Sequence, residues 1–307
     1  MTLTRRQFVQ ALGGAAAAPA VLKAQQAAAP QLPIGFSTLG CPKWPWKTIV
    51  DVAAREGYAA LEIRGLEGEM DLTKRPEFTS SVASTLADLR GRNLRIAVLG
   101  SSAQLHHRDA AARAKHLDEG RRFIDLAAKL EAPYVRVFGD KLLPDEPKTA
   151  TMDRVAGGLR ELSAHAKGSG VQVLIESHGD FTDAETLLAM LKAAGDGPGL
   201  VWDAHHTVVA GKEKPADTYR ALKPYVRHTH LKDSRPDGDG VRYVLTGTGT
   251  VPVRETVNVL KAGGYRGYYS FEWEKMWHPD IEDPEVAIPH FAKVMREYLA
   301  KEPRSGQ

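Results

Sequence analysis

The sequence contains a single cysteine, Cys41, among its 307 residues. One thiol cannot form an internal disulfide, and it cannot supply a zinc site built from several cysteines. The chain also has no run that approaches the ~20 consecutive apolar residues that a membrane helix requires. These absences exclude a disulfide scaffold and a cysteine-ligated zinc protein, and they predict no membrane span.

An excess of charge of either sign is also missing. Lys and Arg outnumber Asp and Glu by only three (41 against 38), and two of the cations, Arg5 and Arg6, lie at the extreme N-terminus. A nearly neutral surface offers no broad electrostatic footprint for nucleic acid, so we expect no nucleic-acid partner. The apolar fraction of 43% is that of an ordinary globular protein with material for a large core.

A dinucleotide fingerprint of the form G-x-G-x-x-G does not follow any early strand-like segment. Gly247-Thr248-Gly249 stands alone, without the pattern of a helix that would begin at a phosphate. A doubly wound nucleotide-binding sheet is therefore the less favoured of two α/β folds.

What the chain does have is one repeated unit, a short β-rich run followed by a helical pattern. Several of the runs are almost continuously apolar, which is typical of parallel strands covered on both faces. Eight such units in about 270 residues predict a single-domain (β/α)8 TIM barrel. The predicted strands are Ile34–Ser37, Ala60–Ile63, Leu94–Leu99, Tyr134–Phe138, Val171–Glu176, Leu200–Asp203, Val226–Leu231 and Tyr268–Glu272.

Local signals mark where the helices begin and end. Gly57 follows the helical run 48–56, and Gly195 follows the run 183–194; glycine readily adopts the left-handed conformation that ends a helix. Asp283-Pro284-Glu285 combines an N-cap acid with a proline at the first helical position, and predicts the start of the last helix.

The N-terminus has the features of an export signal. Thr4-Arg5-Arg6-Gln7-Phe8 precedes a mildly apolar stretch, and Ala18-Pro19-Ala20 offers small residues for cleavage. This order fits a twin-arginine signal. We expect a signal and tether over residues 1–30, the barrel over 31–302 and a tail over 303–307. The expected location is periplasmic or otherwise extracytoplasmic, with the twin-arginine export machinery as a partner.

Four late strands end in potential metal ligands. Active sites of barrels lie at the carboxyl ends of the strands, where these side chains would meet around one axis. Three carboxylates in a partly buried mouth repel one another unless a cation neutralises them. Three oxygen ligands and one imidazole suit Mn²⁺, Mg²⁺ or Co²⁺, with Zn²⁺ as a further option. The four residues are Glu176, Asp203, His230 and Glu272.

Each of these residues also has a simpler interpretation. One acid at a strand end is commonly a helix cap or an ion-pair partner, so the hypothesis depends on the set of four. The spacing Asp203-Ala204-His205-His206 favours His206 over His205 as the histidine that faces the site. His228 shares a strand face with His230, and His230 is preferred because it lies nearer the strand's end.

The strand endings resemble the xylose isomerase-like barrels of the sugar phosphate isomerase/epimerase family, over essentially the whole chain after the signal. The segments that carry the resemblance are Ile175-Glu176-Ser177-His178, Trp202-Asp203-Ala204-His205-His206, His228-Thr229-His230-Leu231-Lys232-Asp233, Gly264-Tyr265-Arg266-Gly267-Tyr268 and Tyr269-Ser270-Phe271-Glu272.

The resemblance implies roles for individual residues. In ketose 3-epimerases of this family two glutamates bind the metal and act as acid and base on opposite faces of the sugar; the matching positions are Glu176 and Glu272. Asp203 and His230 complete the implied metal shell. His206 and Arg235 match residues that contact substrate, although Arg235 lies one position closer to the histidine than the epimerase pattern has it.

The implied chemistry is proton transfer next to a carbonyl. A divalent ion stabilises the enediolate, and return of the proton to the opposite face gives an epimerase, or to the next carbon an isomerase. Loss of a group β to the carbonyl would instead make the protein a lyase or hydratase, for example on 3-keto-glycosides. Export favours a free sugar or sugar derivative over a phosphorylated metabolite.

Three other functions fit the sequence less well. Endonuclease IV shares this barrel type but needs an Asp-x-His pair that is missing after His230, and a retaining glycosidase would leave Asp203 and His230 unexplained. An exported sugar-binding module would stack aromatic rings on the sugar without needing the acids.

Further side chains at the expected mouth complete the predicted site. We expect Trp44, Trp273 and His178 to contact the carbohydrate substrate, or the tryptophans simply to pack under loops. Lys232 is expected to pair with Asp233. Arg64, which follows the second strand, is expected either to bind substrate or to form an ion pair.

Overall fold

A computed structural model describes residues 30–300 of the chain. The predicted export signal, apart from Pro30, and the C-terminal tail lie outside the described residues.

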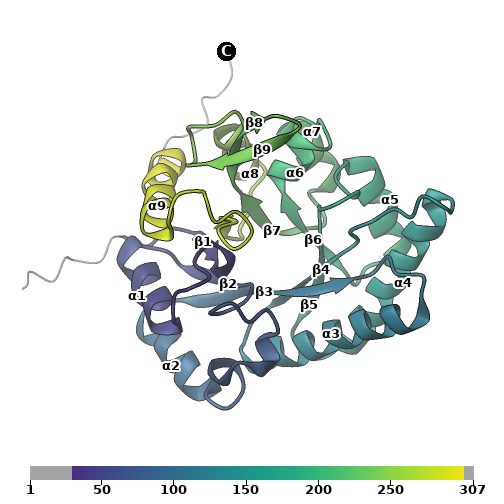
Figure 1. Cartoon of the computed structure of the whole chain (residues 1–307), viewed down its shortest axis with the longest axis horizontal. Helices are drawn as coiled ribbons and strands as arrows, with labels where there is room; N and C mark the ends of the chain where they lie inside the picture. Colours follow the sequence, from purple (N-terminus) through teal and green to yellow (C-terminus); the bar gives the residue numbers. More distant parts are fainter. Residues whose placement is uncertain (1–29, 301–307) are drawn as a thin grey trace, which may run out of the picture.

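Eight parallel strands form a closed barrel in the order β1-β10-β7-β6-β5-β4-β3-β2 (Figure 1). The ring closes because β1 pairs with β10 on one side and with β2 on the other. The TIM barrel prediction is confirmed. The strands are β1 (Ile34–Ser37), β2 (Ala60–Ile63), β3 (Arg95–Gln104), β4 (Tyr134–Phe138), β5 (Gln172–Glu176), β6 (Gly199–Asp203), β7 (Val226–Leu231) and β10 (Tyr269–Phe271).

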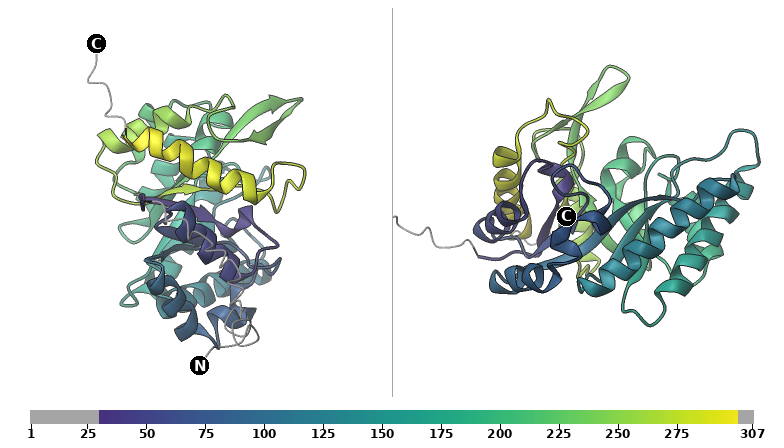
Figure 2. Two further views of the ribbon diagram at one scale, coloured as in Figure 1. Left: turned by 90° about the vertical axis from the view of Figure 1, so that its left-hand side faces the viewer. Right: turned by 60° about the horizontal axis from the view of Figure 1, so that its bottom comes forward.

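Helices surround the barrel and cover its outer face (Figures 1 and 2). Gly57 ends the first helix with a left-handed φ of 81°, as the sequence predicted. Short 3₁₀ turns lie at Thr38–Gly40, Leu72–Lys74 and Pro76–Phe78. The helices are α1 (Trp46–Glu56), α2 (Val82–Gly91), α3 (Ala110–Lys129), α4 (Lys148–Ala166), α5 (Ala184–Ala194), α6 (Ala204–Val209), α7 (Pro215–Leu222), α8 (Val253–Ala262) and α9 (Pro284–Ala300).

The strands are buried on both faces, as their apolar sequences require. Outward-facing residues pack under the helices, and inward-facing residues fill the barrel. β2 shows the consequence most clearly: its four residues, Ala-Leu-Glu-Ile, are all buried, so a glutamate lies inside the protein. Polar side chains in the barrel interior therefore need partners from other strands.

One element was not predicted. β8 (Asp233–Asp237) and β9 (Gly240–Val244) form an antiparallel hairpin after β7. Figure 2 shows this hairpin extending beyond the barrel wall.

Within residues 30–300, no helix combines the length and hydropathy that crossing a membrane would require.

Candidate metal centre and active site

Four side chains converge at the carboxyl ends of consecutive barrel strands. Glu176 ends β5, Asp203 ends β6, His230 is the second-last residue of β7, and Glu272 directly follows β10. One donor atom of each lies within 4.8 Å of the others. We call these four residues the ligand quartet. The strand order places β6 and β7 between β5 and β10, so the two glutamates approach from opposite sides.

The imidazole of His230 lies at the centre of the quartet. Its Nδ1 is 3.3 Å from Glu176 Oε1, 3.3 Å from Glu272 Oε2 and 3.6 Å from Asp203 Oδ2. Burial alone would lower the pKa of His230, but the surrounding carboxylates outweigh it and raise this pKa well above its usual value. The charges of the quartet therefore favour a cation at this point.

The donor atoms of the quartet fit a metal ion. Glu176 Oε2, Asp203 Oδ2 and His230 Nδ1 are shielded from solvent and have no hydrogen-bond partner. Arg136 and Lys232 approach the two oxygens as ion pairs without hydrogen-bond geometry. Buried polar atoms are rarely left unsatisfied, and three of them at one point indicate a missing ligand. Three carboxylates and one imidazole suit a hard or borderline divalent ion.

Glu62 holds His230 from the other side, inside the barrel. Its Oε2 lies 2.8 Å from His230 Nε2 and 3.0 Å from His228 Nε2, and it has no solvent exposure. A hydrogen bond from Nε2–H to Glu62 leaves the Nδ1 lone pair directed at the quartet, which is the arrangement a metal-binding histidine needs. Burial would raise the pKa of Glu62, but the two histidines hold it well below its usual value.

Lys232 is fully buried beside the quartet. Its Nζ lies 2.8 Å from Asp203 Oδ2 and 2.6 Å from Glu274 Oε1, and it also pairs with Glu272. Burial would lower the pKa of Lys232, but these acids raise it well above its usual value. The expected pair with Asp233 is wrong, because three acids across the mouth surround the ammonium instead.

Asp233 anchors the following loop. Its carboxylate accepts hydrogen bonds from the backbone N–H groups of Gly247 and Gly249 at 2.9 Å and of Val251 at 3.1 Å. The Gly247-Thr248-Gly249 turn thus surrounds the carboxylate of Asp233. This contact explains the two glycines without a bound cofactor.

Two histidines lie beside the quartet with partly exposed rings. His206 Nε2 is 3.5 Å from Asp203 Oδ2, and its ring meets that of His178 edge to face at 5.1 Å. His178 Nδ1 lies 3.3 Å from Asp140 Oδ1, which orients the ring. His205 is buried and directs its Nε2 to Ser234 Oγ at 2.8 Å. His206 and His178 therefore lie beside the quartet, and their contacts with a substrate stay predictions.

The other predicted contact residues have different surroundings. Trp44 donates its indole N–H to Glu285 at 2.9 Å, and Trp273, which has no exposed surface, donates to the Glu282 carbonyl at 2.9 Å. Arg235 is exposed on β8 and donates to the Thr248 carbonyl at 2.8 Å. These contacts give packing and loop-anchoring roles, and the predicted substrate contacts of the three residues stay predictions.

Basic side chains lie on the β2–β4 side of the mouth. Arg136 Nε is 3.0 Å from Glu176 Oε2, and its Nη1 donates to the Ser101 carbonyl at 2.9 Å. Gly100 makes room for these side chains, because a Cβ there would lie 2.8 Å from Arg64 Cδ and 2.9 Å from Arg136 Nη2.

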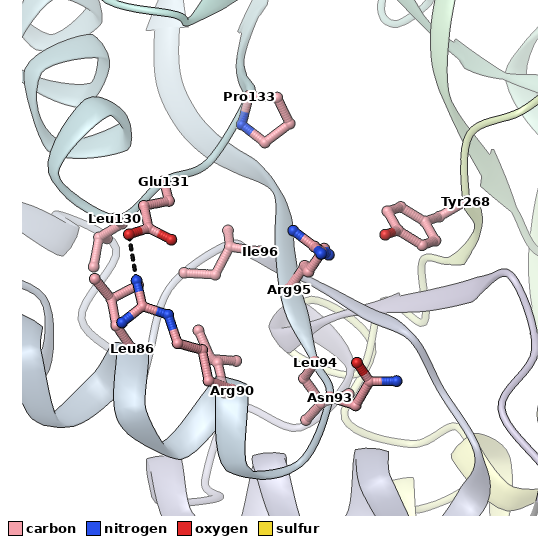
Figure 3. A pocket seen from close by; sticks show the side chains of 11 residues that line it. Leu86, Arg90, Asn93, Leu94, Arg95, Ile96, Leu130, Glu131, Pro133 and Tyr268 are labelled. Atoms are coloured by element: carbon pink, nitrogen blue, oxygen red, sulfur yellow. Dashed lines mark hydrogen bonds and ion pairs between the residues drawn. The ribbon is translucent and has the colours of Figure 1, made fainter.

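A separate pocket lies away from this site, among residues at the starts of the strands (Figure 3). Leu94, Arg95 and Ile96 line it at the beginning of β3, and Arg90 pairs with Glu131 along its edge. Because barrel enzymes place their chemistry at the carboxyl ends of the strands, we assign the active site to the quartet and not to this pocket.

A sequence profile described as the xylose isomerase-like TIM barrel matches residues 50–298. The chain belongs to this family. Inosose dehydratase of Serratia proteamaculans is 29% identical over 167 residues, which are 48% of this chain and 53% of that protein. The chain thus spans about half the length of the curated relatives it matches.

Solved structures of other proteins share the fold. The IOLI protein with a bound zinc atom superposes with a TM-score of 0.74 at 17% identity, covering 89% of this chain and 100% of that one. The 3-keto-D-glucoside 4-epimerase YcjR from E. coli gives a TM-score of 0.70 at 14% identity, covering 88% and 100%. At these identities the likeness establishes the barrel, and the chemistry must be argued from the quartet.

Proposed function

We propose that this family member is a divalent-metal-dependent isomerase or epimerase of a free sugar or sugar derivative. The observation that carries the proposal is the ligand quartet, in which two glutamates from β5 and β10 flank Asp203 and His230. The proposed ion is Mn²⁺, Mg²⁺, Co²⁺ or Zn²⁺, held by Glu176, Asp203, His230 and Glu272. A bound divalent ion would polarise the substrate carbonyl and stabilise the negative charge that follows loss of the neighbouring proton.

Both glutamates are held in the ionised form. Burial would raise the pKa of both carboxyls, yet Arg136 acts on Glu176, and His230 and Lys232 act on Glu272, so that both pKa values are lowered. Both side chains are thus carboxylates that can accept a proton. One removes the proton next to the carbonyl, and the other returns it from the opposite side, which inverts the carbon. His206 and His178 orient the substrate hydroxyl groups.

A second candidate is a lyase that removes water from a keto sugar. The observation that favours it is that inosose dehydratases are among the curated relatives. The first step would be the same proton removal by one glutamate. Expulsion of a β-hydroxyl needs a proton donor, and we propose one of the two partly exposed histidines beside the quartet for this role.

One assay separates these outcomes. Metal-loaded protein is incubated in D₂O with ketoses, aldoses and 3-keto-glycosides, and deuterium incorporation and product are read by NMR. Inverted configuration at the labelled carbon marks an epimerase, a carbonyl at the next carbon an isomerase, and loss of water a lyase. If no sugar exchanges a proton while the metal is bound, the proposed chemistry is wrong.

The metal centre is tested separately. Asp203→Ala removes a ligand, and elemental analysis of the purified variant is expected to show most of the metal lost, whereas Asp217→Ala on the exposed face of α7 keeps it. Full occupancy in Asp203→Ala would contradict the site.

We also propose export through the twin-arginine pathway, on the strength of Arg5-Arg6 and Ala18-Pro19-Ala20. Replacing Arg5 and Arg6 together by lysine is expected to leave the precursor uncleaved inside the cell. Unchanged export of this variant would contradict the proposal.

A further inference from the structure

Arg64 carries a buried guanidinium without a partner. The residue directly follows β2 at the mouth, and only 8% of its surface is exposed. Its Nη1 is shielded from solvent and has no hydrogen-bond partner, and no carboxylate among residues 30–300 forms an ion pair with it. The sequence left open an ion pair or a substrate contact for Arg64, and the structure provides no such ion pair.

The neighbouring cations are placed differently. Arg136 has Glu176 and the Ser101 carbonyl as partners, and Lys232 has Asp203, Glu272 and Glu274. Of the buried cations Arg64, Arg136 and Lys232 at this mouth, Arg64 is the one that has no acid in contact with its charge. A buried charge without a partner is expensive, and a protein that retains one commonly uses it for a ligand.

The electrostatic setting agrees with an unsatisfied cation. Burial lowers the pKa of Arg64 to about 9, and the positive charge of Arg136 acts in the same direction. An anion beside Arg64 would stabilise its positive charge and so raise this pKa again. Glu176 and Glu272 attract the guanidinium from a distance but do not contact it.

The space beside this residue is small. Arg64 lines a cavity together with Thr38, Leu66, Met70 and Met276, and this cavity admits about one water-sized group. The loops that enclose it follow β1, β2 and β10, so the cavity opens at the same end of the barrel as the quartet. The missing Cβ at Gly100 keeps the aliphatic stem of Arg64 free to lie across β3.

We propose that Arg64 binds a carboxylate of the substrate, so that the substrate is an acidic sugar derivative whose carbonyl end faces the ligand quartet. The inference rests on the proposed function and names its substrate class. One uncommitted guanidinium matches one negative charge, and its planar donors fit both oxygens of a carboxylate. A phosphate ester would bring a second charge that the committed Arg136 and Lys232 are not free to take up.

The test compares sugars that differ in one group. Calorimetry measures binding to the metal-loaded protein of D-fructose and of D-fructuronate, in which the terminal CH₂OH is a carboxylate. The pairs D-tagatose with D-tagaturonate and D-glucose with D-glucuronate vary the configuration, and D-fructose 6-phosphate supplies the doubly charged ester. In at least one pair we expect the acid to bind at least about tenfold more tightly than the neutral sugar.

Variants locate the preference. Arg64→Met keeps the length of the side chain and removes its charge, and it is expected to abolish the preference while neutral sugars bind within about twofold of their original affinity. Arg64→Lys keeps the charge and part of the preference. Arg90→Met is the matched control, because Arg90 is exposed and lines the pocket at the starts of the strands (Figure 3), so that this variant should leave the preference intact.

A second readout needs no ligand. Because Arg64 has no partner to lose, Arg64→Met is expected to unfold at the same temperature as the original protein or at a higher one. A lower unfolding temperature, or failure to fold, would show that Arg64 is structural and would overturn the inference. So would the absence of a carboxylate preference in every pair, its survival in Arg64→Met, or tighter binding of the phosphate ester than of the acids.

The binding measurement is independent of turnover. A carboxylate preference that depends on Arg64, without deuterium exchange in any sugar, supports this inference and counts against the proposed function. Exchange in neutral sugars without the preference supports the proposed function and overturns this inference.

Discussion

The two sides of the barrel mouth carry opposite charge. On the side of β5, β6 and β10, three carboxylates surround one imidazole and leave room for a cation. On the side of β2 and β4, two arginines lie across Gly100, and one of them has no acid beside it. The acidic side thus fits a metal, and the basic side fits an anion. A substrate that spans both would have its carbonyl and its negative group fixed at once.

Glu62 comes from a strand of the basic side but contacts a residue of the acidic side. It belongs to β2 and lies two residues before Arg64 in sequence, yet its carboxylate reaches across the barrel to His228 and His230. The carboxylate therefore serves the acidic side and leaves Arg64 without an acid. The charge on the basic side is uncompensated because its nearest glutamate in sequence has another partner.

The largest expected effect comes from removing the bases of the acidic side. Glu176→Gln and Glu272→Gln keep the side-chain shape and a weak oxygen ligand, so turnover is expected to fall by about 10² to 10⁴, the usual contribution of a general base, while metal content falls less. Steady-state kinetics and elemental analysis of the same samples measure both quantities.

The pattern of loss distinguishes the reactions. An epimerase needs both glutamates, whereas a lyase needs one as base and is expected to show unequal losses. Glu185→Gln, exposed on α5, serves as the control. Near-normal rates in both variants with metal bound would mean that the acids only hold the ion.

The next effect tests the link between the sides. Glu62→Gln is expected to weaken metal binding by about 10- to 100-fold, because the variant no longer fixes the Nε2–H form of His230 as strongly. Competition with a metal-sensitive chelator measures the affinity, and Glu255→Gln on the exposed face of α8 is the control. An unchanged metal affinity in Glu62→Gln would show that Glu62 does not support the metal centre.

The strand endings show how far sequence could predict this site. Glu176, Asp203, His230 and Glu272 each end or follow an apolar run, and parallel strands bring such ends together. Glu62 could not be found in this way, because its partner His230 lies 168 residues further along the chain. Its signal was weaker: one acid in the otherwise apolar run Ala60–Ile63, which had to be buried once the barrel formed.

Local contacts that involve the backbone were also beyond prediction. Adjacent opposite charges suggested a Lys232–Asp233 pair, but Asp233 is satisfied by four backbone N–H groups, which no side-chain pattern displays. The β8–β9 hairpin was missed because Pro236 argues against a strand, although Asp237-Gly238 is a frequent turn sequence. Proline is tolerated there because the hairpin has only two strands.

A smaller effect concerns stability behind the acidic side. Burial, reinforced by the charge of Lys232, lowers the pKa of His205 to about 3 from an ordinary 6.5. Between these values the unfolded chain binds the extra proton, so stability is full above about pH 6.5 and is lost as pH falls towards 3.

Denaturant unfolding of the original protein and of His205→Asn tests this linkage. From pH 7 to pH 5 we expect the original protein to lose about 2 kcal/mol more than the variant, whose amide does not titrate. His165→Asn, a partly exposed histidine on α4, is the control. Parallel pH profiles for the original protein and His205→Asn would contradict the assignment of a buried neutral imidazole.

The smallest effect is expected on the basic side, from Gly100→Ala. The new methyl would lie 2.8 Å from Arg64 Cδ and 2.9 Å from Arg136 Nη2, so both arginines must shift. Flexible side chains yield at modest cost, and we expect the free energy of unfolding to fall by about 1 kcal/mol. Gly157→Ala in α4 is the matched control, since its methyl meets only Arg160 Nη2 at 3.7 Å and should stabilise the helix. Because the quartet is built from other strands, the metal content of Gly100→Ala should be unchanged, while any preference for acidic sugars should weaken. Loss of metal in this variant would mean that the arginines of the basic side also support the metal site. The two sides of the mouth would then not act independently.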